Sequence, residues 1–463
     1  MFDQSFSERN LRTIFEVENR KGNYIENDFF PSVASITTSL TKKRASCRIA
    51  KKEFYRKRAE YYRIKTPVLK GVVDKLGQRV KIKIKHIAKY KEIRERLLSE
   101  ELQQLSLELT TSPPMLDLTP LGKIKGKDAF RLGKSAKEYF QYKQILYNLK
   151  KAFGVKQNDR DLITSQLAVA INGQFPKILL RTDISSFYES IERSRLEKLL
   201  VSNTLLDTHS KSQILHVLKS YQTISGSSKG VPRGVGISAL LVEIYMKEFD
   251  RSIRNREDVI FYGRYVDDIA VVFDTEGMEP ASDQKYRNIV EDECSRLGLN
   301  LNSAKTFTQY SPKPFDIEYL GYKFKSDQKS EITLELSDSR ERRYKKKIDR
   351  AFSSYFFDLM FDEKKATRLL LARIRFLTGN THLYNNKRRA MIGIYFTNRL
   401  VSTTAPFTRL DHYMKSKIRR VKSPNLRKRL EDFSFKTGFE GKLYYKFSTN
   451  RISEIVSAWE HVS

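Results

Sequence analysis

Three aspartates are the residues of this sequence best suited to chemistry. Asp183 follows an apolar run at 178–180, and Asp267 and Asp268 stand together between two apolar segments. Adjacent carboxylates repel one another unless a cation compensates their charge. Mg²⁺ binds carboxylate and phosphate oxygens, and two such ions about 4 Å apart can activate a hydroxyl and stabilise a leaving pyrophosphate. The aspartates therefore predict a site for two Mg²⁺ ions, with a solvent-facing acidic turn as the plainer alternative.

Neighbouring strands are needed to bring these carboxylates together. We expect strands at 178–180 and on both sides of the Asp267-Asp268 pair, and a helix after Asp183. The glycine-rich segment 230–236 predicts a tight turn that allows a flat ligand to approach the main chain, with Ser238 capping the next helix. One apolar face of that helix is predicted to contain Leu240, Leu241, Ile244 and Tyr245.

The rest of the chain is predicted to be mostly helical. Residues 1–110 are expected to form helices, with a strand at 80–87, and a boundary follows at 112–114. Helices are expected at 138–153 and 159–172, and basic helices after 331. Residues 177–324 mix short strands and helices, an α+β pattern. Two further features complete this region: Lys305 just after a short strand, and a tight aromatic turn at 319–322.

The charge of the chain is strongly positive. Lys and Arg number 87 against 55 Asp and Glu, a net charge of +32. Such an excess favours a polyanionic partner, most often a nucleic acid, over a merely basic surface. Between residues 42 and 70, twelve Lys and Arg accompany two acids and three tyrosines, Tyr55, Tyr61 and Tyr62. This stretch is either a helix face that binds phosphates and stacks on bases or an ordinary solvated face.

Cysteine content and hydropathy exclude several protein classes. Cys47 and Cys294 are too few for a disulfide framework or a four-cysteine zinc module, and both are predicted to be core thiols. No apolar run approaches the ~18 residues of a membrane helix, and the first residues lack a signal peptide's apolar core. We expect a soluble protein of a reducing compartment, without a membrane partner.

Taken in order, these segments resemble the reverse transcriptase family over roughly residues 120–325. Asp183 matches the first catalytic motif, and Asp267 and Asp268 within YVDD match the metal-binding signature. VPRG with ISALLVEIYM matches the motif between them. The motif-D lysine corresponds to Lys305, and the primer-grip turn corresponds to Tyr319, Leu320, Gly321 and Tyr322.

The resemblance implies an α+β right-hand polymerase fold. It implies a basic, mostly helical N-terminal region at 1–115 that is part of the fingers. A fingers–palm core with an antiparallel sheet follows at 116–330, and a helical, basic thumb and C-terminal region at 331–463. The implied activity is RNA-directed DNA synthesis from an RNA template and dNTPs, with two Mg²⁺ ions, or Mn²⁺ in their place.

Site residues follow from the same resemblance. Asp183, Asp267 and Asp268 would hold the metals with help from the Ile184 carbonyl. Tyr188 occupies the sugar-gate position, where a ring would exclude a ribose 2′-hydroxyl. The remaining nucleotide-binding candidates are Phe187, Arg233, Gly234, Lys305, Lys123, Lys125, Lys127 and Arg131.

Two departures from the family pattern affect these assignments. The family usually has Gln where Arg233 stands, and Arg cannot accept a hydrogen bond. The fingers also lack the familiar Arg-x-x-x-Pro pattern, so the triphosphate contacts cannot be aligned residue by residue.

Within the family, the sequence is most similar to bacterial defence-associated and abortive-infection enzymes. The strings that carry this similarity are RTDISSFYESI, GVPRG, FLTGN and IYFTN, and the opening of the chain resembles the smaller enzyme of the type 3 defence systems. The resemblance implies antiphage defence in the bacterial cytoplasm, a dedicated noncoding RNA template, nascent DNA, and a second reverse transcriptase or accessory protein. A homo-oligomer is a further alternative.

Other functions stay open at this point. The chain could be a catalytically retired palm that acts as an RNA-binding scaffold, although intact Asp183, Asp267 and Asp268 count against this. It could synthesise RNA on an RNA template, which Tyr188 disfavours unless its ring is only core packing. It could also be a polymerase of a retron or a group II intron-like element.

Overall fold

The computed structural model describes residues 2–124, 126–276, 282–311, 313–327, 329, 331–383 and 390–459. The chain divides into two compact units, which are described separately. The first contains residues up to 119 together with 131–148, and the second contains 120–130 together with 149–463.

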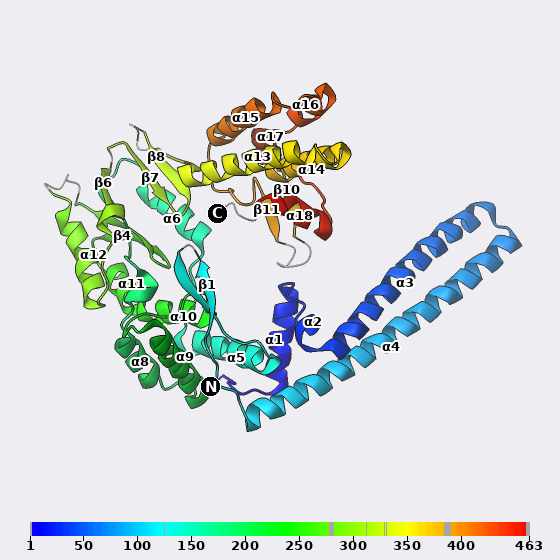
Figure 1. Cartoon of the computed structure of the whole chain (residues 1–463), viewed down its shortest axis with the longest axis horizontal. Coiled ribbons are helices and arrows are strands. Elements are labelled where there is room, and N and C mark those ends of the chain that lie inside the picture. Colours follow the sequence, from blue (N-terminus) through cyan, green and yellow to red (C-terminus); the bar gives the residue numbers. More distant parts are fainter. Residues whose placement is uncertain are drawn as a thin grey trace. The chain divides into compact units, whose positions relative to one another are not determined.

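The first unit is helical. It contains α1 (Glu8–Arg20), α2 (Glu26–Phe29), α3 (Pro31–Ile64) and α4 (Pro67–Thr111). Its core lies where α1 meets the ends of the long helices, around Leu11, Phe15, Phe30 and Leu102. From there α3 and α4 extend side by side as an antiparallel pair (Figure 1). Thr66 begins α4 by accepting a hydrogen bond from the Leu69 N–H.

The strand expected at 80–87 is wrong, because this segment lies inside α4. Its alternating lysines and isoleucines fit a strand pattern, but lysine is also a good helix former. Ile82 and Ile84 are about half exposed. Alternation of apolar and polar residues indicates a strand only where the apolar face is buried, and here it is not. The helix ends at Thr111, next to the boundary predicted at 112–114.

A four-stranded antiparallel sheet forms the centre of the second unit. Its order is β4-β5-β3-β6, with β3 (Lys177–Asp183), β4 (Val259–Tyr265), β5 (Asp268–Asp274) and β6 (Phe307–Ser311). The inner strands β3 and β5 are apolar and almost entirely buried. The helices of this part are α6 (Arg160–Ile171), α7 (Phe187–Ser190), α8 (Arg193–Ser202), α9 (Thr208–Ser225), α10 (Gly236–Tyr245), α11 (Lys247–Arg254), α12 (Gln284–Arg296) and the 3₁₀ helix η1 (Ser303–Lys305). Helix α5 (Ala136–Phe153) belongs mostly to the first unit, which contains its residues 136–148.

Smaller antiparallel sheets complete the strands. β7 (Phe315–Tyr319), β8 (Tyr322–Ser326) and β9 (Ile332–Leu336) form a three-stranded sheet. Two hairpin pairs are β1 (Thr119–Ile124) with β2 (Lys127–Arg131), and β10 (Asn380–His382) with β11 (Met391–Gly393).

Helices follow β9 and form a separate group in Figure 1. They are α13 (Asp338–Asp358), α14 (Glu363–Thr378), α15 (Ala405–Ile418), α16 (Pro424–Glu431), α17 (Phe435–Glu440), α18 (Thr449–Val456) and η2 (Ser457–Trp459). Their apolar faces share one core with the β7–β9 sheet, including Tyr319, Phe324, Ile374 and Phe407. The architecture is thus α+β with antiparallel sheets, as predicted.

Two local predictions were wrong, and a third was too narrow. Ser238 does not cap α10, which begins at Gly236; its buried hydroxyl has no partner in the described part of the chain. The face of α10 predicted to be apolar is buried, and so are Ile237, Val242 and Glu243, so burial extends beyond that one face. Lys305 ends η1 instead of following a strand, since Leu301 forms only a single bridge to Ile184.

Other predictions were confirmed. Both cysteines are buried free thiols. Among the described residues, no helix combines the length and apolar character needed to cross a membrane. Helix α6, predicted at 159–172, begins after Asp159, whose side chain accepts from the N–H groups of Asp161 and Leu162.

Candidate active site

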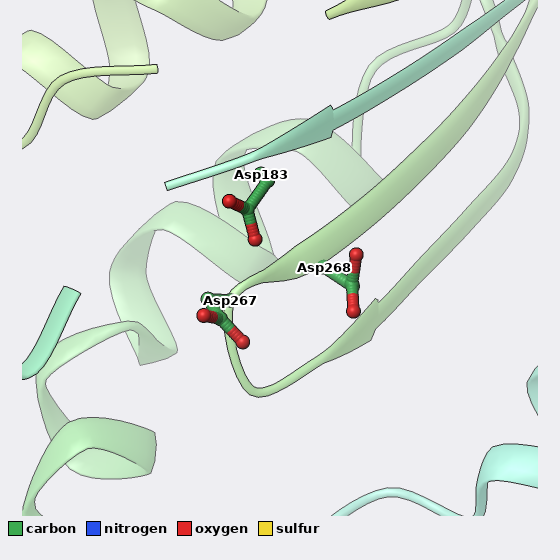
Figure 2. A group of neighbouring side chains, drawn as sticks. All are labelled: Asp183, Asp267 and Asp268. Carbon is green, nitrogen blue, oxygen red and sulfur yellow. The ribbon is translucent and has the colours of Figure 1, made fainter. Parts of the chain in front are cut away.

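Strand register brings the three aspartates together. β3 and β5 pair so that Asp183 lies directly opposite Asp268, and the Ile184 N–H donates to the Asp267 carbonyl at 3.2 Å. Carboxylate oxygens of Asp183, Asp267 and Asp268 all lie within 4.8 Å of one another. Figure 2 shows the three side chains around the same end of the two strands. Asp183 and the Asp267-Asp268 pair are more than eighty residues apart in the sequence, and the antiparallel pairing of β3 with β5 brings them together.

A strained turn presents Asp267. The hairpin from β4 to β5 places Val266 at φ 61°, a left-handed conformation that is rare for a β-branched residue. The buried guanidinium of Arg264 donates to the Val266 carbonyl at 2.8 Å. Backbone strain of this kind persists only where the surroundings impose it, and it is common at functional sites.

Arg264 is itself fixed by two carboxylates. Its side chain is fully buried and pairs with Glu243 of α10 at 2.6 Å and with Asp250 of α11 at 2.7 Å. Buried charges are stable only when paired and hydrogen-bonded. The network therefore ties the turn to two helices behind the sheet.

The electrostatics of the cluster favour a cation. Burial raises the pKa of Asp267, and the Asp183 carboxylate adds to the rise. Burial also raises the pKa of Asp268, although Arg181 opposes it at 3.2 Å. Lys305 is paired with Asp183 at 2.8 Å. Three converging carboxylates match the donor preference of Mg²⁺, so the residues present fit a divalent metal site.

Beside the aspartates, α7 carries the aromatic pair Phe187 and Tyr188. Phe187 is buried, whereas Tyr188 is only partly so. The Arg233 guanidinium lies over the Tyr188 ring, 4.8 Å from its centroid. Arg233 donates two hydrogen bonds to the Glu189 carboxylate, from Nε at 2.7 Å and from Nη2 at 3.0 Å. Arg233 is therefore held next to Tyr188 by a bidentate ion pair.

The turn at Gly234 packs closely against strand β2. Gly234 has φ 85°, and a Cβ there would lie 2.7 Å from the Phe130 carbonyl oxygen. The Phe130 N–H also donates to the Arg233 carbonyl at 2.8 Å. Gly234 is thus required for the close approach of strand β2.

The lysines expected to contact a triphosphate occupy the β1–β2 hairpin. Lys123 in β1 and Arg131 in β2 are exposed. Lys127 reaches Glu189 at 3.2 Å and so joins the Arg233 cluster. Lys125 lies outside the described residues.

The aromatic turn at 319–322 is present, but its rings point into the protein. Tyr319 and Tyr322 are each 1% exposed, and the turn uses positive φ at Leu320 and Gly321. The Tyr319 hydroxyl donates to the Asp268 carbonyl at 3.3 Å, which links the turn to the aspartate site.

Two arginines cover this turn. Arg160 donates through Nε to the Leu320 carbonyl at 2.8 Å, and the Arg340 guanidinium lies 4.5 Å from the Tyr322 ring centroid. A Cβ on Gly321 would collide with both guanidinium groups. The surface of the turn is therefore cationic rather than aromatic.

Sequence reasoning missed three residues of this site: Arg181, Glu189 and Arg264. Arg181 could have been found, because side chains two apart on a strand share a face and Asp183 follows it by two. Glu189 and Arg264 gave no local signal, since their roles depend on partners more than ten residues away.

Comparison with known proteins agrees with this geometry. Residues 136–324 match the family model described as reverse transcriptase (RNA-dependent DNA polymerase). The matched range contains all three aspartates and the 319–322 turn. None of the curated proteins matches the chain by sequence. The chain therefore contains a reverse transcriptase domain, the domain class of RNA-directed DNA polymerases, which are nucleotidyltransferases.

Solved telomerase structures are similar to the chain at low identity. One is telomerase from Candida albicans with a fragment of telomeric RNA, at 13% identity and TM-score 0.30, covering 69% of this chain and 54% of that one. Another is apo telomerase from Candida tropicalis, at 12% identity and TM-score 0.34, covering 74% and 60%. The chain spans between about half and three fifths of the length of these two proteins.

Proposed function

We propose that this protein, which contains a reverse transcriptase domain at 136–324, is an active RNA-directed DNA polymerase. The observation that carries the proposal is the convergence of Asp183, Asp267 and Asp268 on one space within that domain. A retired palm has no use for three clustered carboxylates, because their mutual repulsion destabilises the fold without a cation.

In this proposal the three aspartates hold two Mg²⁺ ions, or Mn²⁺ in their place, with the Ile184 carbonyl assisting. The ions would activate a 3′-hydroxyl and stabilise the leaving pyrophosphate. Arg264 and the turn at Val266 keep Asp267 in position. Lys305, which pairs with Asp183 at 2.8 Å, is proposed to turn toward the phosphates of an incoming nucleotide.

Tyr188 and the residues around it are proposed to select the nucleotide. Tyr188 would exclude the ribose 2′-hydroxyl, with Phe187 buried beside it. Arg233 and Gly234 would lie near the nascent pair, and Lys123 and Arg131 are candidates for the triphosphate. The 319–322 turn, with Tyr319, Leu320, Gly321 and Tyr322, is proposed to position the primer strand.

Nucleic acid is the proposed partner of the C-terminal helices as well. A cavity of about 810 Å³ opens between α14, α16 and α18. Its lining includes one acid, Glu363, and six cations: Lys364, Arg368, Arg375, Arg429, Lys446 and Arg451. Among the residues that the structure describes, only Arg451 of these six is in an ion pair, with Glu454. Free cations around a cavity favour a phosphate-bearing ligand.

The biological role is proposed from the sequence resemblance. We propose antiphage defence in the bacterial cytoplasm, with a dedicated noncoding RNA as template. A second reverse transcriptase or accessory protein would be an additional partner. Purifying the protein with its bound nucleic acid, and sequencing both the RNA and any DNA made, tests this role directly.

The activity is tested by isosteric substitution. Asp183→Asn or Asp267→Asn should abolish dNTP incorporation on a primed RNA template while RNA binding is retained. Asp274→Asn, at the opposite end of β5, is the matched control and should keep incorporation near wild type. Incorporation at wild-type rate by Asp267→Asn contradicts the assignment, and RNA binding without incorporation by the wild type supports the scaffold alternative.

A further inference from the structure

The outer part of the α3–α4 hairpin, residues 42–91, has an unusual charge. We call this segment the basic arm. It contains nineteen Lys and Arg against three acids, a net charge of +16, which is half of the chain's +32. Among the described residues, only Lys57 of these cations is in an ion pair, with Glu60. The charge is therefore not neutralised within the protein.

The basic arm has few buried residues. Within it only Cys47, Ala50 and Val80 are buried, no residue from 51 to 79 is buried, and the main contacts of α3 are with α4. A helix normally depends on packing of an apolar face for its stability, and like charges on neighbouring turns oppose it. A hairpin built in this way is stabilised by a ligand that supplies negative charge.

The length of the basic arm suits contact with a series of nucleic-acid phosphates. The helical stretch 67–91 is about 37 Å long at 1.5 Å per residue. A nucleic-acid strand presents a phosphate about every 3.4 Å. Between the two helices a cleft of about 280 Å³ is lined by Lys42, Lys43, Ser46, Lys83 and His86. A cleft of this size with three lysines suits a phosphate group.

Aromatic side chains on the same arm indicate unpaired bases. Tyr55 and Tyr62 are 58% and 59% exposed, and seven residues apart they lie on one face of α3. Between them the Arg58 guanidinium lies 5.6 Å from the Tyr62 ring centroid. Exposed tyrosines and arginine planes are the groups on which splayed-out RNA bases stack.

We propose that the basic arm binds a structured RNA through its phosphates and through unpaired loop bases stacked on Tyr55 and Tyr62. This contact is separate from the aspartate site and lies within the first unit. The proposal goes beyond polymerase activity, because it gives the enzyme a second RNA-binding surface. The idea rests on binding alone, so it can fail or succeed independently of the proposed activity.

The test measures the affinity of the full-length protein for labelled nucleic acids as a function of salt. The probes are an RNA hairpin with an unpaired loop, a fully paired RNA of equal charge, and the same two designs in DNA. The first variant is Tyr55→Ala with Tyr62→Ala, and its rescue is Tyr55→Phe with Tyr62→Phe. The second replaces Lys81, Lys83 and Lys85 with Gln.

Expected results differ for the two variants. Loss of both rings should weaken loop-RNA binding at least about 25-fold, about fivefold for each ring, and leave paired RNA nearly unchanged, and the phenylalanine variant should restore binding. The lysine variant should reduce the slope of log affinity against log salt by about 2 to 3 on both RNAs. Controls outside the arm are Tyr24→Ala with Phe175→Ala, and Gln at Lys156, Lys198 and Lys219.

Several outcomes would overturn the proposal. One is unchanged affinity and salt slope in both arm variants. Equal binding of the DNA hairpin would refute RNA as the ligand. If vesicles with anionic headgroups bind the wild type but not the lysine variant, while RNA binding is unaffected, the arm is a lipid-binding surface instead. Circular dichroism of each variant ensures that a lost affinity does not reflect an unfolded arm.

Discussion

At the scale of single residues, the aspartate site is a place where folding and function oppose each other. Burial raises the pKa of Asp267 and Asp268 above the ordinary value of about 3.9. The folded protein therefore holds protons that the unfolded chain has already released. Without a metal, this contribution to stability is present at low pH and is lost as the pH rises through the folded-state pKa values.

Replacing one of these carboxylates should reveal the conflict. In EDTA at pH 7, Asp267→Asn should unfold at a temperature equal to or higher than the wild type, because it removes buried repulsion. Adding Mg²⁺ should raise the wild-type melting temperature and leave that of Asp267→Asn nearly unchanged. Lowering the pH toward 5 should reduce the Mg²⁺ effect, since protons compete for the same oxygens. A variant that responds to Mg²⁺ like the wild type would remove Asp267 from the metal site.

Tyr188 gives a second residue-scale prediction. Tyr188→Val should raise incorporation of ribonucleotides relative to deoxyribonucleotides, because the ring would no longer meet the 2′-hydroxyl. The ratio of the two kcat/KM values is the measurement. Since Arg233 lies over this ring, Arg233→Gln serves as the control for disturbed packing. If Tyr188→Val lowers both activities equally and leaves the ratio unchanged, the ring is a packing residue.

At the scale of elements, stability of the turn that presents Asp267 depends on the buried Arg264 network. Arg264→Met should lower the free energy of unfolding by about 3–5 kcal/mol, because Glu243 would be left buried without its cation and Asp250, of its described partners, would keep only the Tyr262 hydroxyl. Denaturant unfolding measures the loss. Arg256→Met, which breaks the more exposed pair with Asp258, is the matched control and should cost no more than about 1 kcal/mol. Equal effects of the two substitutions would contradict the role given to burial.

Elements also explain what could be predicted from the sequence. The strands before Asp183 and around Asp267-Asp268 are short apolar runs beside turn residues, so local pattern was enough to place them. The segment 80–87 has the same local alternation, yet it is helical, because neither of its faces packs on a sheet. At Gly234 the sequence predicts a tight turn, in which a positive φ is common. It does not predict the contact with Phe130, because Phe130 lies in a hairpin about a hundred residues earlier in the chain.

At the scale of the whole molecule, charge is divided between two segments. The basic arm has a net charge of +16, and residues 331–463 have +15, from twenty-nine Lys and Arg against fourteen acids. All other residues together contribute +1. The reverse transcriptase domain is therefore nearly neutral outside these segments. Long-range attraction of nucleic acid must come from the arm and the C-terminal helices.

Two separate charged segments should contribute independently to RNA affinity. The arm variant carries Gln at Lys81, Lys83 and Lys85, and a cavity variant carries Gln at Lys364, Arg368 and Lys446. Each should reduce the slope of log affinity against log salt by about 2 to 3, because fewer phosphate contacts release fewer counterions when RNA binds. Substitutions that share no partner within the protein are additive, so the combined variant should lose the sum of the two slopes. Isothermal titrations between 50 and 200 mM salt, run on one long structured RNA, would measure all three, with the Lys156, Lys198 and Lys219 substitutions as the charge-matched control. If the combined variant binds RNA no more weakly than either single variant, RNA contacts only one segment at a time. If the control loses as much affinity as the arm and cavity variants, net charge sets the affinity and its placement does not.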